Sequence, residues 1–244
     1  MADTLDLIPL LLSAKKVSWR SPGEYESDSA FMTLRPKVLD RDDYKCRHCA
    51  FRAVNWHEIH HLNDDHNDHR LENLVTACSY CHMCHHIGLA GVNDEAVLIW
   101  LPEISQIEVN HLVRAIQIVK SGRPSNVAPQ AAPSAVDREF SEMGNKLFEA
   151  LKSRSGEAKS RIGTENPETL ANIFLRMNDR DYARRGEFLA GIRLLPLGVR
   201  RQGNRDVMPE MVSSWQATGG DFVGNKPKDW GSMLRHYSDA LGNA

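Results

Sequence analysis

The sequence has few aromatic residues, almost no excess charge and no long apolar run, and each shortage excludes a class of protein. Aromatic residues make up 7% of the 244 residues, while 41% are hydrophobic and 25% are charged. This balance is typical of a globular chain and excludes collagen-like and globally disordered proteins. Because 30 basic residues face 32 acidic ones, the net charge is -2, and a dedicated nucleic-acid binder is not expected.

The longest apolar stretch near the start covers residues 5–12 and is interrupted by Asp6 and Pro9. No basic segment precedes it. It therefore fits neither a signal peptide nor a membrane-spanning helix, and we expect a cytoplasmic protein.

Hydrophobic periodicity predicts most elements of the first half. We expect an irregular or strand-bearing start over residues 1–34. After it we expect a short helix at 37–43, a strand at 56–62 and a polar loop at 63–68. A helix beginning near Cys78 or Cys81 and a buried strand at 96–101 follow. A capping box, Ser105-x-x-Glu108, then opens an amphipathic helix.

Small residues and prolines between residues 121 and 135 predict a linker. It would separate a domain at 1–120 from a mostly helical region at 136–244. Apolar spacing predicts one helix at 136–151, and Asn166 followed by Pro167 predicts the start of another. A further apolar stripe surrounds Trp230.

Cysteine and histidine are concentrated in a short part of the chain. All five Cys and nine of the 11 His lie between Arg41 and His86. Two close pairs, Cys46-x2-Cys49 and Cys78-x2-Cys81, predict a structural zinc site, because four thiolates complete the tetrahedron that zinc prefers. Buried inert thiols and a redox centre are the alternatives. Cys84 could replace Cys78 or Cys81 by a shift of one helical turn, and we prefer the wider pairing with Cys84 free.

Between the cysteine pairs stand His60-His61, then Asn73-Leu74, then Cys81-His82, an order that resembles the HNH, or ββα-metal, nuclease motif. The resemblance implies that His61 is a general base and that Asn73 orients it. His60 and His82 would hold one divalent ion, and His85 and His86 on the next turn could also reach it. Since His60 stands where many such motifs carry Asp, a softer ion than magnesium would suit the site.

The residues around this motif favour a surface that repels DNA. Four arginines could contact a nucleic-acid backbone, namely Arg41, Arg47, Arg52 and Arg70. Seven acidic residues outnumber them over the same stretch. A hydrogen-bonded or solvated histidine is the simpler interpretation of His57, His66, His69, His85 and His86.

The whole chain resembles the IcmJ (DotN) family of the type IVB (Dot/Icm) secretion system. The similar blocks are DYKCRHCAF at 43–51, NDHRLENLVTAC at 67–78, LIWLPEISQ at 98–106 as a strand-to-helix turn, and IRLLP at 192–196 as a late helical segment. The resemblance implies an HNH-like α+β fold with structural Zn2+, used as an architectural part. It also implies binding to the C-terminal region of a DotL-like coupling ATPase, at the cytoplasmic face of the inner membrane, in support of effector recruitment.

The sequence therefore predicts an HNH-like zinc-binding domain, followed by a mostly helical lobe, in a non-catalytic subunit of a secretion coupling complex. Its partner would lie in an apolar groove, with Val97, Ile99 and Trp100, or the stripe around Trp230, as candidate anchors. A metal-dependent HNH endonuclease using His61 and Asn73 is the alternative function. A zinc module that binds DNA without cutting it is a third.

Overall fold

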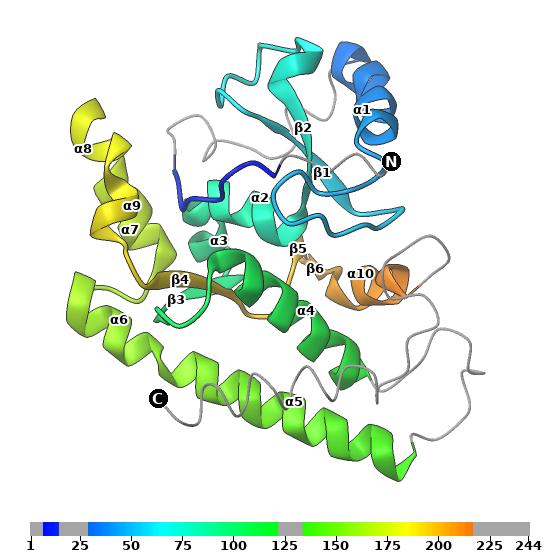
Figure 1. The fold of residues 1–244 in the computed structure, drawn as a ribbon, viewed down its shortest axis with the longest axis vertical. Coiled ribbons are helices and arrows are strands. Elements are labelled where there is room, and N and C mark those ends of the chain that lie inside the picture. Colours follow the sequence, from blue (N-terminus) through cyan, green and yellow to red (C-terminus); the bar gives the residue numbers. More distant parts are fainter. Residues whose placement is uncertain (1–6, 15–28, 122–133, 217–244) are drawn as a thin grey trace.

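The computed structural model describes residues 7–14, 29–121 and 134–216. Figure 1 shows the arrangement of its elements. In the first half these are α1 (Ser29–Arg41), β1 (His57–His61), the short 3-10 helix η2 (Leu71–Asn73), β2 (Leu74–Cys78), α2 (Ser79–His85), α3 (Ile87–Val92), β3 (Ala96–Trp100) and α4 (Gln106–Ser121). In the second half they are α5 (Ala135–Ser153), α6 (Ser155–Ile162), α7 (Pro167–Phe174), α8 (Asp179–Ala183), α9 (Arg185–Phe188), β4 (Ile192–Pro196), β5 (Arg201–Gln202), β6 (Arg205–Asp206) and α10 (Met208–Trp215).

Helices and small antiparallel strand pairs are mixed along the chain, which confirms the α+β class. The strands form three two-stranded sheets in the described residues: β1 with β2, β3 with β4, and β5 with β6. The expected strands at 56–62 and 96–101 appear as β1 and β3. The predicted capping box also forms, since the Ser105 backbone N–H donates to Glu108 and the Glu108 N–H donates to the Ser105 hydroxyl.

Two elements differ from the expectation. The first helix begins at Ser29, well before residue 37, and it contains Pro36, which removes one helical hydrogen bond. Packing offsets this cost, because Val38 is buried in a small cluster with Ile59 of β1 and Leu74 of β2.

The block at Ile192–Pro196, expected to be helical, is instead the strand β4. It pairs antiparallel with β3, and Leu194 and Leu195 are fully buried. Its partner strand lies far away in the sequence, so local periodicity could not reveal the pairing.

Elements from both sides of residues 122–133 pack together. The long helix α5 lies along α4, α6 packs against β3, and α3 packs against α7 (Figure 1). One core of buried side chains runs from the cysteine-rich region to α10. The domain boundaries at 120 and 136 stay a prediction, and most of the linker and the stripe around Trp230 lie outside the described residues.

The candidate anchors on β3 belong to this core. Ile99 is fully buried, and Val97 and Trp100 pack partly buried against the same cluster.

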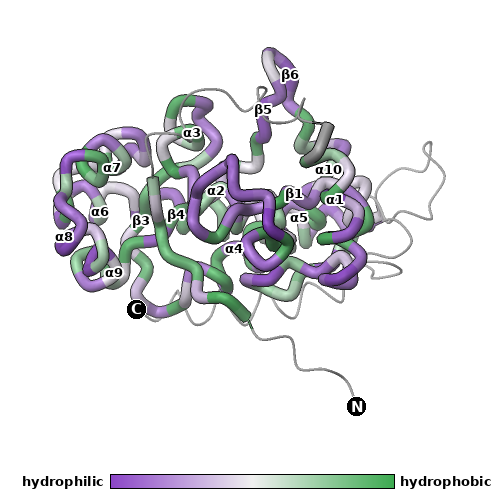
Figure 2. The backbone as a smooth tube through the Cα atoms, turned by 90° about the horizontal axis from the view of Figure 1, so that it is seen from above, coloured by the Kyte–Doolittle hydropathy of each residue, from purple (hydrophilic) through white to green (hydrophobic). Residues whose placement is uncertain are grey.

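The β5–β6 hairpin, in contrast to these core residues, is exposed and hydrophilic, and Figure 2 shows it projecting from the body. Among the described helices, none is both long enough and apolar enough to cross a bilayer.

Candidate metal centre

Cys46 and Cys49 lie in a tight turn between α1 and β1. The Cys46 N–H donates to the carbonyl of Phe51 at 2.9 Å, which closes the turn on itself. The Arg47 N–H donates to the carbonyl of Thr76 in β2 at 2.8 Å. This turn is thereby attached beside the strand that delivers the second cysteine pair.

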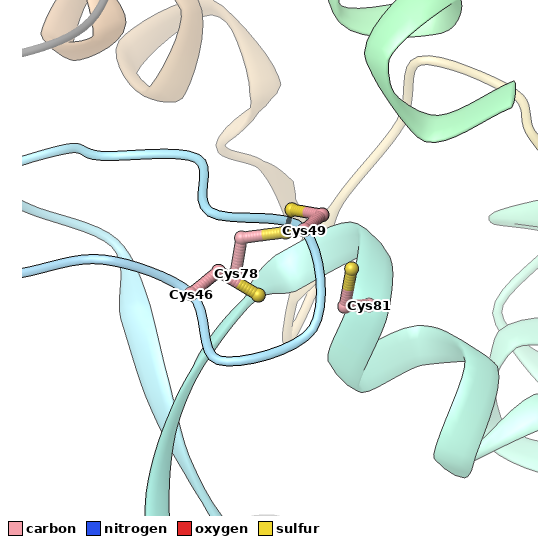
Figure 3. Close-up of side chains that lie close together, drawn as sticks. All are labelled: Cys46, Cys49, Cys78 and Cys81. Carbon is pink, nitrogen blue, oxygen red and sulfur yellow. Dashed lines mark hydrogen bonds between the residues drawn. The ribbon is translucent and has the colours of Figure 1, made fainter. Parts of the chain in front are cut away.

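Cys78 is the last residue of β2 and the N-cap residue of α2, and Cys81 lies in the first turn of that helix. The strand-to-helix junction points both side chains toward the turn that carries Cys46 and Cys49 (Figure 3). A helix N-terminus favours negative charge, so this junction also suits thiolates.

The four cysteines form one compact, buried group. Their sulfur atoms all lie within 4.8 Å of one another, and Cys49 Sγ is 3.7 Å from Cys78 Sγ. Sulfurs held at roughly 2.3 Å from zinc in a tetrahedron are about 3.8 Å apart. The group can therefore hold a metal ion and is compatible with zinc.

Arg114 of α4 places a buried positive charge against these sulfurs. Its guanidinium donates to Cys78 Sγ at 3.1 Å and lies 3.9 Å from the ring centroid of Phe51. Burial raises the pKa of the Cys78 thiol, but hydrogen bonds from the other three cysteines and the charge of Arg114 outweigh this, so its pKa lies well below the ordinary value. Asn110, one turn earlier, donates to Cys81 Sγ at 3.4 Å. Both contacts would stabilise the negative charge of four thiolates.

Cys84 lies outside the four-sulfur group. Its thiol is buried and donates to the carbonyl of Tyr80 at 3.3 Å. Burial raises its pKa above the ordinary value for a thiol. That Cys78 and Cys81, and not Cys84, complete the site with Cys46 and Cys49 stays a prediction, and the separate position of Cys84 agrees with it.

A second group consists of His60 at the end of β1, His82 on α2 and His86 just after it. Their ring nitrogens lie within 4.8 Å of one another. Nε2 of His82 is 3.1 Å from Nε2 of His86, and the ring of His60 lies 5.7 Å from that of His82 between centroids. The fold thus brings together His60 and His82, which the motif predicts as ligands of one ion, and His86, which the sequence placed within reach of that ion.

The roles predicted for His61 and Asn73 stay predictions, and the two side chains make separate contacts in the fold. The Asn73 amide donates to the Asn63 side chain and to the carbonyl of Asp68, so it holds the 63–68 loop together. His61 is buried, and its ring stacks with Phe31 at 5.8 Å between centroids. Nε2 of His61 has no hydrogen-bond partner in the described part of the chain.

The comparison with curated proteins finds a relative along nearly the whole chain. The type 4 apparatus protein DotN of Legionella pneumophila is 28% identical over an alignment of 222 residues, which covers 89% of this chain and 94% of that protein. The chain is similar to DotN. The resemblance stated from the sequence is therefore confirmed, whereas the HNH-like part of that assignment stays a prediction. No family model matches the sequence.

Sequence reasoning missed the residues that surround both groups. Arg114 and Asn110 stand among the apolar positions of an amphipathic helix, and a charged residue on that buried face was the available signal. Glu58 contacts His82, and Arg200 contacts Glu58. These two residues gave no such signal, because they are 142 residues apart and meet only in the folded chain.

Proposed function

We propose that this protein is a zinc-binding, non-catalytic subunit of a type IV secretion apparatus. The observation that carries the proposal is the similarity to DotN, which covers 89% of the chain and 94% of the relative. Such coverage favours a shared architecture over a single shared motif. The buried four-cysteine group supports a structural role for the metal, since a closed tetrahedral site leaves no position for a substrate.

The proposed partner is the C-terminal region of a DotL-like coupling ATPase. The protein would support effector recruitment within that coupling complex, and it would sit at the cytoplasmic face of the inner membrane through its partners.

The test is co-expression with the C-terminal region of the coupling ATPase encoded in the same genome, followed by size-exclusion chromatography and metal analysis of one sample. A stable complex carrying zinc is expected. Failure of the two purified chains to associate would overturn the partner assignment.

The endonuclease alternative is not favoured by the site. A general base must reach its water, and the His61 side chain is 4% exposed. The Asn73 side chain is hydrogen-bonded to the 63–68 loop. We expect no cleavage when the chain is incubated with supercoiled plasmid and magnesium, manganese or nickel. Cleavage that His61→Ala abolishes would overturn the non-catalytic proposal.

The third interpretation, binding of DNA without cleavage, has its own test. Retention of the protein on DNA that falls steeply with salt would support it. We expect no retention at about 0.1 M salt, because acidic residues outnumber basic ones around the histidine group.

A further inference from the structure

We infer that a pocket beside the segment 7–14 is a docking site for a peptide of another protein, one that carries a large apolar side chain next to a carboxylate. The pocket lies between this segment, the start of α4, α9 and the start of β4 (Figure 1). It is lined by none of the cysteines or histidines of the two groups described above. The inference therefore rests neither on metal binding nor on the proposed role in secretion.

Apolar side chains form the floor of the pocket. Leu12, Leu189 and Ile192 line it, and each is at most 9% exposed. The volume of the pocket is about 330 Å³, close to the lower end of the roughly 300–1,000 Å³ that is typical of ligand pockets. The space therefore suits a side chain such as leucine or phenylalanine with its flanking backbone, and burial of that side chain would favour binding.

The mouth of the pocket is open to solvent. Leu11, which lines it, is 43% exposed. A Cβ at Gly186 of α9 would lie 3.4 Å from Cδ2 of Leu11, so these two residues face each other. Because Gly186 has no side chain, the space in front of Leu11 stays open on the α9 side. A side chain of another molecule can therefore enter between them.

The segment beside the pocket offers a backbone group to a second chain. Hydrogen bonds hold it on both sides, since the Ile8 N–H donates to the Arg47 carbonyl at 2.8 Å and the Ser13 N–H donates to the Cys84 carbonyl at 2.9 Å. Between these two points, the N–H of the exposed Leu11 donates to no acceptor in the described residues. A peptide that runs along the segment can accept this hydrogen bond, as peptides do at a free strand edge.

Two arginines bring positive charge to the pocket without a carboxylate partner in the described part of the chain. Nε of Arg185 donates to the Leu12 carbonyl at 2.9 Å, and Nε of Arg193 donates to the Ile104 carbonyl at 2.7 Å. Nη1 of each also donates to a carbonyl, and Nη2 of neither has an acceptor among the described residues. These neutral acceptors fix the two guanidinium groups in place and leave their charge uncompensated.

Arg193 differs in this respect from the buried Arg200. The charge of Glu58 raises the pKa of Arg200 above its ordinary value. Burial lowers the pKa of Arg193, and the nearby charges of Glu108 and Glu103 do not outweigh it. Both of these carboxylates have other hydrogen-bond partners. A carboxylate that enters the pocket would thus meet a guanidinium that is already partly desolvated, which strengthens the attraction.

The three features together select the occupant. The apolar floor accepts an apolar side chain, the free N–H accepts a backbone carbonyl, and the two guanidinium groups accept a carboxylate through paired hydrogen bonds. An inorganic anion would leave the floor in contact with water. A purely apolar peptide would partly bury the two charges without pairing them, which is costly. A peptide with both an acidic and a large apolar side chain satisfies all three.

Selection from a phage-displayed library of random peptides on the purified full chain tests the inference. Peptides that also bind the variant Arg185→Gln/Arg193→Gln are removed from the pool first. We expect the enriched peptides to place a leucine, isoleucine or phenylalanine within a few positions of an aspartate or glutamate. Enrichment of no peptide, or of peptides without an acidic residue, would overturn the inference.

The affinity of one enriched peptide, labelled with fluorescein, is then measured by fluorescence anisotropy. Arg185→Gln and Arg193→Gln should each weaken binding about 10-fold or more, because a partly buried charge pair is lost. The control Arg180→Gln removes the same charge from an exposed position on α8 outside the pocket, and it should change the affinity less than about 2-fold. Equal losses in Arg193→Gln and Arg180→Gln would overturn the inference, because general attraction of acidic peptides would explain them.

A second pair of variants keeps both arginines and tests the pocket if their replacement disturbs the fold. Leu11→Glu places a like charge at the mouth and should weaken binding about 10-fold or more. Leu7→Glu, at a similarly exposed leucine that does not line the pocket, should bind like the wild type. Equal affinities of these two variants would overturn the inference. A dimer of the wild-type chain that Leu11→Glu dissociates in size-exclusion chromatography would assign the pocket to a second copy, and it would overturn the inference too.

Discussion

Nη2 of Arg114 lies 3.1 Å from Sγ of Cys78, and both side chains are buried. A guanidinium is costly to bury unless a negative charge faces it. Four thiolates around a divalent ion carry a net charge of about -2. With an ion bound, the positive charge of Arg114 and the negative charge of the sulfurs would lower the cost of burying each other, and the contact would be strong only when both are in place.

Replacing Arg114 with Met should therefore weaken zinc binding more than it disturbs packing. We expect a fall in zinc affinity of about 10–100-fold, measured by competition with a chromophoric chelator. Arg114→Lys should restore little, since an ammonium lacks the planar fork that stacks on Phe51 while donating to sulfur. The exposed Arg70→Met is the control and should bind zinc like the wild type. Unchanged affinity in Arg114→Met would contradict the electrostatic role.

The cysteine assignment predicts a contrast between two buried thiols. Cys46→Ser should lower the zinc content and unfold the cysteine-rich region, because metal binding and folding are coupled. Cys84→Ser should keep the zinc, since its sulfur is not among the four that lie together. Metal analysis and thermal melting of both variants provide the measurement. Equal loss of zinc in both would show that Cys84 belongs to the site.

Asp42 connects α1 to the cysteine turn and to β2. Its carboxylate accepts from the Thr76 N–H at 2.9 Å and from Arg41 and Arg47. Asp42→Asn should lower the free energy of unfolding by about 2 kcal/mol, because charge-assisted hydrogen bonds at a buried group are lost. The neighbouring Asp43→Asn, at an exposed side chain, should lower the free energy of unfolding much less. Denaturant unfolding at neutral pH would show the difference, and equal costs would contradict it.

Gly191 precedes β4 in a left-handed conformation with φ at 82°, and a Cβ there would clash with the indole of Trp100. Gly191→Ala should therefore destabilise the protein by about 3 kcal/mol, from backbone strain and a displaced indole together. Gly163 has almost the same φ, 81°, but open space around it. Gly163→Ala should cost only the strain, about 1 kcal/mol. Similar melting temperatures for the two variants would rule out the close packing of Gly191 on Trp100.

The predictable parts of the fold are those set by local sequence. The length and composition of the β1 segment, the capping box before α4 and the Asn166 cap of α7 each depend on residues within a few positions. The cysteine spacing likewise predicted four side chains that lie together in the fold and could hold a metal ion, because cysteine pairs in tight turns are local features.

The missed parts depend on contacts between distant residues. β4 forms only because β3 offers an edge, and α1 passes through Pro36 only because Val38 packs on the strand pair behind it. His86, and not His85, lies with His60 and His82, because the two ring nitrogens of His85 contact Ser13 and His48. None of these partners can be identified from a window of sequence.

The pairing of β3 with β4 has a practical consequence for dissecting the molecule. A fragment that ends at residue 121 would leave the edge of β3 without its neighbour and would uncover the apolar side chains that Leu194 and Leu195 shield. Open strand edges of this kind recruit other chains, so such a truncation is expected to aggregate when expressed alone. Work on the cysteine and histidine sites is therefore best done with point variants of the intact polypeptide.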